Sequence, residues 1–428
     1  MNPTEKLLQQ IYSLSFSVNS ASNLSWNQTD CKSGMVEMQA YVKEVAAAVL
    51  TKTASIIGNW KAIWGPIVYA NDPTSTSVHA DNTMGMYYNE DENVMVIAIA
   101  GTNVNSPFGW LVEDFSVHTT IAWETVTGVP SSGNISNGTH VGLSILRDMQ
   151  NSKEETVITA LKNFLVDNPS RTGMQVAVAG HSLGGALSPT LALFLSDTKS
   201  QWDPTNMTSI GAFPTAGPTP GDEAFASYYE KQIAADKIYY LSQHNAIDVV
   251  PHAWQKEDIE KIPTIYEDYI KQPSDANPAE TITGTLASAA VLNALATKNI
   301  IGVPVNRYQQ ISPSTTLNGT FDTEIDDTIS KKLKYIELVL PLALGKYAVY
   351  LRNLARFAAQ AAVQHTSEYH KLLDIIPFMA EYKTILHTHK PKNQIVLEDY
   401  EYAVKEIAKI DLQKVDEAAL AIAKENAN

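Results

Sequence analysis

The segment Gly180-His181-Ser182-Leu183-Gly184 has the residue types and spacing of a turn that presents a nucleophilic serine. Such a serine stands on a sharp turn between a strand and a helix, and glycines two positions before and after it avoid the crowding of that turn. The helix that follows points its N-terminus at the serine, so the backbone N–H of Leu183 can hold a developing negative charge. The pattern therefore predicts acyl transfer through Ser182.

The surroundings of this segment strengthen the prediction. Three fixed positions recur by chance in roughly one chain in ten of this size, because glycine is a common residue. Here an apolar run over 174–179 leads directly into the motif, and small residues follow it. A strand entering the turn and a helix packed closely on the sheet are the context that the motif requires. The alternative is a tight turn with an incidental serine.

A serine of this kind needs an acid and then a histidine further along the chain. The candidate acids include Asp222, Asp236 and Asp248. Asp248 is favoured because it lies in a loop after a predicted strand over 237–242, and such sheets place their sites at the carboxyl ends of strands. The alternative for Asp248 is a helix cap or a turn.

Five histidines follow this aspartate: His252, His365, His370, His387 and His389. His252 is too close to Asp248 in sequence to sit easily across the nucleophile, and the last two lie in a polar stretch typical of the surface. His365 comes just after a long apolar helix, predicted over about 344–362, which would fix the base beside the serine. We favour His365 as the base, with His370 as the alternative.

Strands and helices alternate around these residues. Strands are predicted over 60–69, 84–88, 94–100, 174–179 and 237–242, and helices over 36–57, 154–166 and 185–195. The strands over 84–88 and 94–100 read as a hairpin. The alternation predicts an α/β fold with a mainly parallel central sheet flanked by helices. Together with the serine turn, it favours the α/β-hydrolase fold.

Three parts of the chain do not follow the alternation of strands and helices. Residues 1–35 are polar and read as a loosely structured lead-in, before a single domain over 36–428. Residues 255–345 show no clear strand and are interpreted as an inserted, mostly helical cap, which would explain the long separation of Asp248 from His365. The tail over 396–425 is rich in Ala, Glu and Lys and is predicted to be helical.

Composition excludes several classes of partner and site. The 428 residues carry a formal net charge of −15, so a basic surface for nucleic acid is not expected. Cys31 is the only cysteine, which excludes an intrachain disulfide and a cysteine metal cluster. No transmembrane segment, metal site or cofactor is predicted. The first residues lack a signal-peptide pattern, which leaves open whether the protein is cytoplasmic or exported without a cleavable signal.

The chain resembles the class 3 lipase family, which includes the fungal triacylglycerol lipases. The string Gly-His-Ser-Leu-Gly-Gly at 180–185 is characteristic of that family, and four further segments agree in order and spacing: 96–102, 110–114, 140–142 and 218–226. The loop at Asp248 resembles the family's Asp-x-Val-Pro, and the segment from His365 its His-Ser/Thr…Tyr. Two positions depart, Ala100 and Thr219, where the family often has arginine.

This resemblance implies a lipase or esterase with Ser182, Asp248 and His365 as its triad. It also implies that the N–H of Thr102 joins that of Leu183 in the oxyanion hole. The implied partner is a lipid or other ester, with transient contact to a lipid surface.

In relatives a lid follows the oxyanion threonine, so Phe108, Trp110 and Leu111 are lid candidates, although Trp110 and Leu111 could instead pack in the core. A phospholipase-type lipase effector and a non-catalytic lipid-binding relative remain the alternative functions.

Overall fold

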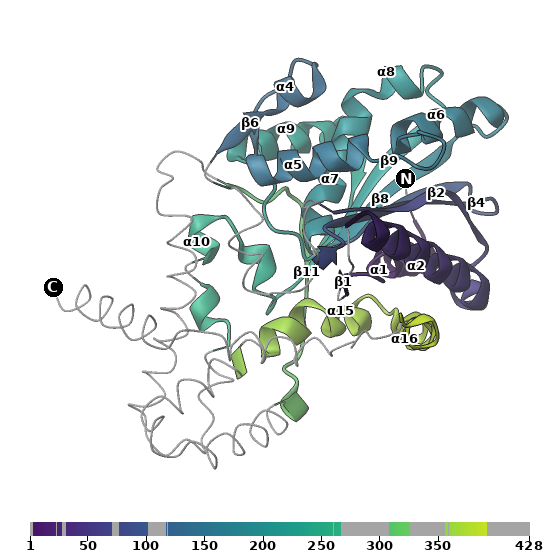
Figure 1. Cartoon of the computed structure of the whole chain (residues 1–428). Coiled ribbons are helices and arrows are strands. Elements are labelled where there is room, and N and C mark those ends of the chain that lie inside the picture. The colour runs from purple at the N-terminus through teal and green to yellow at the C-terminus, as the bar shows by residue number, and fades with distance from the viewer. Residues whose placement is uncertain are drawn as a thin grey trace, which may run out of the picture.

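The computed structural model describes residues 3–22, 24–27, 31–70, 77–101, 117, 119–259, 261–266, 308–325, 356–357 and 359–391. Within these residues, helices cover both faces of a central twisted sheet (Figure 1). This is the α/β architecture that the alternating strands and helices predict.

The central sheet has eight strands among the described residues. They are β2 (Trp60–Tyr69), β4 (Asn82–Asn89), β5 (Val94–Ile99), β8 (Met174–His181), β9 (Thr208–Thr215), β10 (Ile238–Tyr240), β11 (Ser242–Asn245) and β12 (Ser314–Leu317). Their order is β12-β11-β9-β8-β5-β4-β2, and β10 also pairs with β9. All pairs from β5 to β12 are parallel, whereas β4 is antiparallel to β5 and β2. The predicted hairpin and the mainly parallel sheet are both confirmed.

Two small antiparallel pairs lie outside this sheet. One joins β1 (Ser25–Asn27) to β3 (Ser77–His79), and the other joins β6 (Thr120–Ala122) to β7 (Asn134–Ser136).

The helices form two layers. One face carries α1 (Glu5–Ser17), α2 (Cys31–Lys52), α3 (Ala54–Ile57) and α16 (Ile376–His389). The opposite face carries α4 (Trp123–Thr127), α5 (Asn137–Asp148), α6 (Val157–Asp167), α7 (Leu183–Asp197), α8 (Lys199–Trp202) and α9 (Glu223–Ala234). Short elements complete the described chain: α10 (Lys256–Ile259), α15 (Ser367–Leu372) and two 3₁₀ turns, Val250–His252 and Ile262–Thr264. Figure 1 shows α5, α7 and α9 above the sheet, with α1, α2 and α16 below it.

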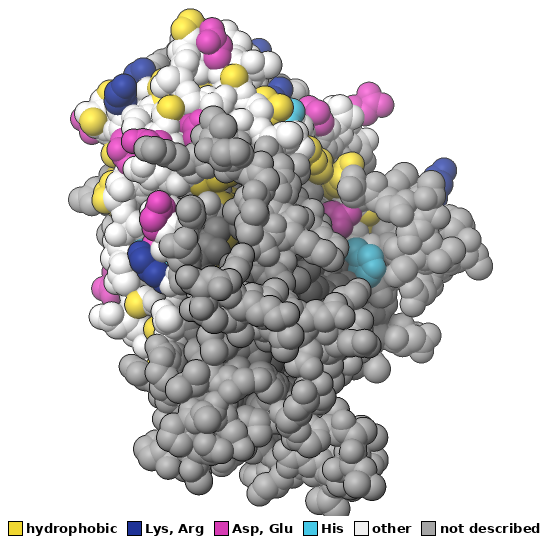
Figure 2. All heavy atoms as spheres, turned by 90° about the vertical axis from the view of Figure 1, so that its left-hand side faces the viewer, with side chains coloured by type: hydrophobic (Ala, Val, Ile, Leu, Met, Phe, Trp, Pro, Cys, Tyr) yellow, Lys and Arg dark blue, Asp and Glu magenta, His cyan; other side chains and the backbone are white. Residues whose placement is uncertain are grey.

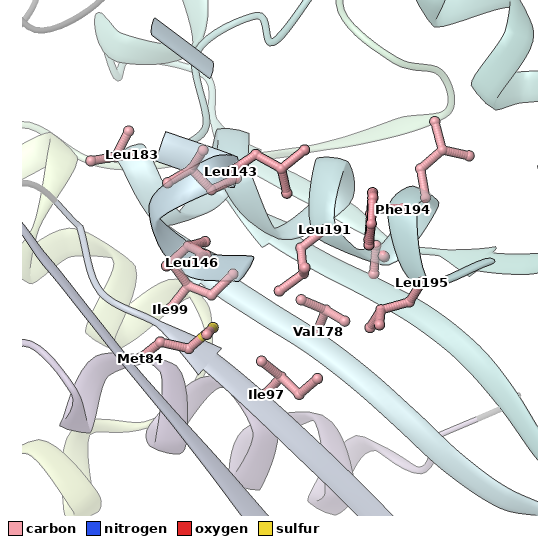
Figure 3. Close-up of a cluster of buried hydrophobic side chains, with 14 of the residues drawn as sticks. Met84, Ile97, Ile99, Leu143, Leu146, Val178, Leu183, Leu191, Phe194 and Leu195 are labelled. Carbon is pink, nitrogen blue, oxygen red and sulfur yellow. The ribbon is translucent and has the colours of Figure 1, made fainter. Parts of the chain in front are cut away.

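The middle strands are apolar throughout because both of their faces are buried. Along β5, Met95, Ile97 and Ile99 join the core under α5 and α7, while Val94, Val96 and Ala98 join the core against α1 and α2. Figure 3 shows the first of these cores, with Ile97 and Val178 of the sheet facing Leu191 of α7. The buried sheet is therefore a rigid base for the loops at its edge.

The expectation of a loosely structured lead-in is wrong for residues 5–17, which form α1. The helix begins at Thr4, whose hydroxyl accepts from the N–H of Leu7, and it packs on β5 and β8. Its buried serines return their hydroxyls to carbonyls of the preceding turn: Ser15 to Tyr12 at 2.9 Å and Ser17 to Leu14 at 2.7 Å. These bonds let polar residues occupy a buried helix face. The polar composition of this segment therefore did not indicate a buried helix.

The expectation that residues 255–345 hold no strand is also wrong at β12, which extends the sheet beside β11. Its side chains from Ser314 to Thr316 are exposed, so this edge strand has no apolar alternation to reveal it. Residues 267–307 and 326–345 lie outside the described residues, as does the tail over 396–425. A cap there remains a prediction.

Among the described residues, no helix is both long enough and apolar enough to cross a bilayer. On the described part of the face in Figure 2, acidic, basic and hydrophobic side chains are interspersed, with no stripe of basic residues.

Candidate active site

Ser182 stands at the junction of β8 and α7 in a strained conformation, with φ 62° and ψ −122°. A Cβ added to Gly180 would lie 2.3 Å from the carbonyl oxygen of Gly184, and one added to Gly184 would lie 2.4 Å from that of Ile99. Both positions therefore require glycine, as the crowding argument predicts. Leu183 begins α7, which places its N–H in the first turn beside the serine.

Asp248 and His365 meet through a short hydrogen bond. The imidazole Nδ1 of His365 lies 2.8 Å from Oδ2 of Asp248, and both residues are buried. The hydroxyl of Tyr369 donates to the same oxygen at 2.9 Å, and the N–H of Val250 donates to Oδ1 at 3.0 Å. Because the carboxylate accepts from Nδ1–H, the other ring nitrogen, Nε2, is left as the basic atom of the neutral imidazole.

His181 ties this histidine to the nucleophile turn. Its Nε2 lies 2.6 Å from the backbone oxygen of His365, its Nδ1 lies 3.0 Å from Oγ1 of Thr215, and the two histidine rings are 4.9 Å apart. Burial, reinforced by His365, holds the pKa of His181 well below its usual value. A neutral ring then donates from Nε2 to the carbonyl and accepts at Nδ1 from the threonine hydroxyl.

Asn245, the last residue of β11, holds the residue that precedes His365. Its Nδ2 donates to Oε1 and to the backbone oxygen of Gln364, at 2.8 and 3.1 Å, and its Oδ1 accepts from the N–H of Gly319 at 3.1 Å. Its own N–H donates to the hydroxyl of Tyr369 at 2.8 Å. Gln364, the residue before His365, is thus bonded to β11, and its Nε2 donates to the carbonyl oxygen of Thr320 in the loop after β12 at 2.7 Å.

The competing acids have other positions. Asp222 is the N-cap of α9, and its Oδ1 accepts from the N–H groups of Phe225 and Asn134 at 2.9 and 3.0 Å. Asp236 lies in the turn before β10 with a left-handed φ of 54°. Of the three candidate acids, Asp248 is the one that the structure brings to a histidine.

The competing histidines also lie elsewhere. The ring of His370 packs edge-on against Phe16, and burial, with Lys383 nearby, lowers its pKa to about 4. His252 ends a 3₁₀ turn, and His389 pairs at 3.0 Å with the exposed Glu44. His387 lies in α16 with His389. His365 itself is the last residue of a helical stretch over 359–365, rather than a loop residue after a helix.

Sequence reasoning did not assign roles to His181, Tyr369 and Asn245. The first two lie inside motifs that carried the resemblance, so their positions were visible although their contacts were not. Asn245 carried no signal. The structure does not describe Thr102, Phe108, Trp110 or Leu111, and the oxyanion and lid predictions at these residues lie outside the described chain.

Residues 96–257 match the model of the family described as Lipase (class 3). Over these residues the chain is similar to the class 3 lipases. A lipase from Rhizomucor miehei is 27% identical over 178 residues, which cover 42% of this chain and 42% of that protein. The chain thus spans less than half the length of this curated relative.

Similarity of fold extends beyond the residues that match the family model. The crystal structure of M37 lipase aligns with a TM-score of 0.60 at 23% identity, over 95% of this chain and 100% of that one. Lipase II from Rhizopus niveus aligns with a TM-score of 0.39 at 18% identity, over 60% of this chain and 78% of that one. The alignment with M37 lipase confirms the predicted α/β-hydrolase fold. Ser182 and Asp248 lie inside the residues that match the family model, and His365 lies outside them.

Proposed function

We propose that this chain is a serine hydrolase that cleaves carboxylic esters of lipids through an acyl-enzyme on Ser182. The observation that carries the proposal is the buried bond between His365 and Asp248, held through His181 against the strained serine turn. A protein that only binds lipid needs none of this, because a strained serine and a paired histidine cost stability without adding contact to a ligand.

Acylation begins with His365. Its Nε2 takes the proton from Oγ of Ser182, and Oγ attacks the ester carbonyl carbon to form a tetrahedral intermediate. The negative charge on the former carbonyl oxygen is met by the N–H of Leu183 and, we propose, by that of Thr102. Loss of one such donor typically lowers the rate about 100- to 1000-fold.

The intermediate then collapses, and the protonated Nε2 gives its proton to the oxygen of the leaving alcohol. A water molecule repeats the sequence on the acyl-enzyme and releases the carboxylic acid. Asp248 holds the imidazole in the useful tautomer and stabilises the imidazolium in both steps. The bonds from Tyr369 and Val250 keep the carboxylate itself in one orientation.

For substrate access, we propose that Phe108, Trp110 and Leu111 belong to a lid. An apolar lid closes over the site in water and opens where a lipid surface offers its apolar side a better environment. The rate on a long-chain ester should then rise sharply once substrate exceeds its solubility, and Trp110→Ala should blunt that rise while sparing soluble short esters. A wild-type rate that saturates smoothly through the solubility limit would reject the lid.

The function is tested with a fluorophosphonate probe on the purified chain, followed by an ester panel. Covalent labelling of Ser182, absent in Ser182→Ala, is the expected result. Hydrolysis of triacylglycerols, phospholipids and short soluble esters then separates a neutral lipase from a phospholipase-type enzyme or a plain esterase. An unlabelled serine together with no hydrolysis across the panel would favour a non-catalytic lipid-binding protein.

A further inference from the structure

Asn19, just after the C-terminal end of α1, reaches the strand that enters the active site. Its side-chain Oδ1 accepts the backbone N–H of Gly101 at 2.8 Å, across 82 positions of sequence. Its Nδ2 donates to the carbonyl oxygens of Ser15 and Phe16 at 3.1 and 3.2 Å. The amide therefore links the last turn of α1 to the segment after β5.

Gly101 lies directly against the nucleophile turn. A Cβ added to it would lie 3.3 Å from Cβ of Ser182 and 3.1 Å from the carbonyl oxygen of His181. The strand ladder of β5 stops at Ile99, which pairs with Gly180. Beyond that point the Gly101 amide is held by a side chain from another part of the chain, instead of by a neighbouring strand.

We propose that Asn19 is a positioning residue for the oxyanion side of the site. By holding the peptide N–H of Gly101, it fixes the backbone beside Ser182 at the point from which Thr102, the proposed oxyanion donor, continues. This inference rests on the proposed function, and it assigns α1 a part in catalysis although the helix lies outside residues 96–257.

The hydrogen bonds of Asn19 hold its side chain in one position. Both functional ends of the Asn19 amide are engaged, the oxygen by Gly101 and the nitrogen by two carbonyls of a helix that is itself buried against β5 and β8. A hydrogen-bond donor acts on an oxyanion only when it is placed in advance, and a displacement of about 1 Å can lower a rate about 100-fold.

Asn19→Ala tests the proposal. We expect kcat to fall about 10- to 100-fold with KM nearly unchanged, because the lost placement matters in the transition state and not in substrate binding. The rate at which a phosphonate labels Ser182 should fall by a similar factor, since its adduct carries an oxygen at the oxyanion position.

Two matched variants separate positioning from general destabilisation. Ser17→Ala removes a buried hydroxyl of the same helix that bonds to Leu14, and Ser22→Ala removes a bond of 3.3 Å to the same Oδ1 of Asn19. Both variants should keep kcat within about twofold of wild type, even where their loss of Tm equals or exceeds that of Asn19→Ala. A kcat of Asn19→Ala within twofold of wild type, or an equal fall in the two controls, would overturn the inference.

Amide hydrogen exchange over residues 94–101 measures the bond between Asn19 and the Gly101 N–H independently of catalysis. We expect faster exchange at Gly101 in Asn19→Ala and no change in Ser22→Ala. Unchanged exchange overturns the inference whatever the activity, whereas failure of wild type to label or hydrolyse overturns the proposed function and, with it, the catalytic part of this inference.

Discussion

The two halves of the site, one around Ser182 and one around His365, are held by different forces. The serine is placed by backbone crowding at a strand-to-helix junction, where a Cβ on Gly180 or Gly184 would clash with neighbouring main chain. The histidine is placed by side-chain hydrogen bonds that join segments more than 100 positions apart, through Asp248, Asn245 and Tyr369.

The two halves also differ in how far their residues lie apart in the sequence. Ser182 and Asp248 lie in residues 96–257, together with His181 and Asn245, whereas His365 and Tyr369 lie in a later segment. A short local motif therefore identifies the first half, and only the folded chain completes the second. Substitutions of side chains should damage the base half selectively, while the serine half should respond to added backbone bulk.

The largest effect is expected from the two residues that share the proposed proton transfer, one from each half. Ser182→Ala and His365→Ala should each lower kcat about 10⁴-fold or more, with near-normal stability for the serine variant. The double variant should be no worse than either single one, because the two residues act in the same proton transfer. Ester hydrolysis and thermal unfolding measure both quantities. If His370→Ala is inactive and His365→Ala is not, the base is wrongly assigned.

A substitution that adds a methyl group close to the backbone should disrupt the serine half of the site. Gly184→Ala would place a methyl group 2.4 Å from the carbonyl oxygen of Ile99, which cannot move without disturbing β5. We expect at least about 100-fold loss of activity and about 1 to 3 kcal/mol loss in the free energy of unfolding.

The control is Gly142→Ala in α5, whose added Cβ would meet the methyl ends of Leu187, 2.9 and 3.1 Å away. A flexible side chain can give way there, so the variant should stay active. Equal damage from both substitutions would argue against a special constraint at the serine turn.

A single hydroxyl tests the base half. Tyr369→Phe removes the bond to Oδ2 of Asp248 and the acceptor of the Asn245 N–H. We expect about a tenfold fall in kcat and about 1 to 2 kcal/mol lower stability, because a buried N–H loses its partner. Urea unfolding and ester hydrolysis measure the two effects, and an unchanged kcat would show that the His365 bond alone orients the carboxylate.

The same contrast explains what sequence could predict. The strands β5 and β8, the hairpin with β4 and the serine turn follow from local apolar runs and from glycine spacing, which depend on near neighbours. Asp248 followed from its position after a strand. The prediction of His365 rests on the helix expected before it and on a matching segment, because its contact with Asp248 spans 117 positions.

Two elements were predicted wrongly because their composition does not match their position in the fold. In α1, the hydroxyls of Ser15 and Ser17 bond to backbone carbonyls, so a buried helix has a polar composition. The edge strand β12 keeps its side chains exposed and lacks an apolar face. The role of Tyr369 needs a partner 121 positions away. None of these features has the apolar periodicity on which the prediction of elements depends.

The last expected effect is on acid stability and leaves catalysis at neutral pH unchanged. His370 packs on Phe16 beneath the base half, and its pKa in the folded protein is about 4, against about 6.5 in an unfolded chain. Above pH 6.5 the ring is neutral in both states and contributes no pH dependence. As pH falls from 6.5 toward 4, the unfolded chain binds a proton that the folded protein does not, so stability is lost in this window.

The loss from this one group should reach about 2 to 3 kcal/mol near pH 4 and then level off, because both states are protonated below that pH. His181, with its pKa also lowered by burial, adds a loss of the same sign. Thermal unfolding of wild type and His370→Gln between pH 7.5 and 4.5 measures the effect. The variant should lose less stability than wild type over this range. Parallel curves would mean that His370 does not govern the acid response, and that carboxylates elsewhere in the protein do.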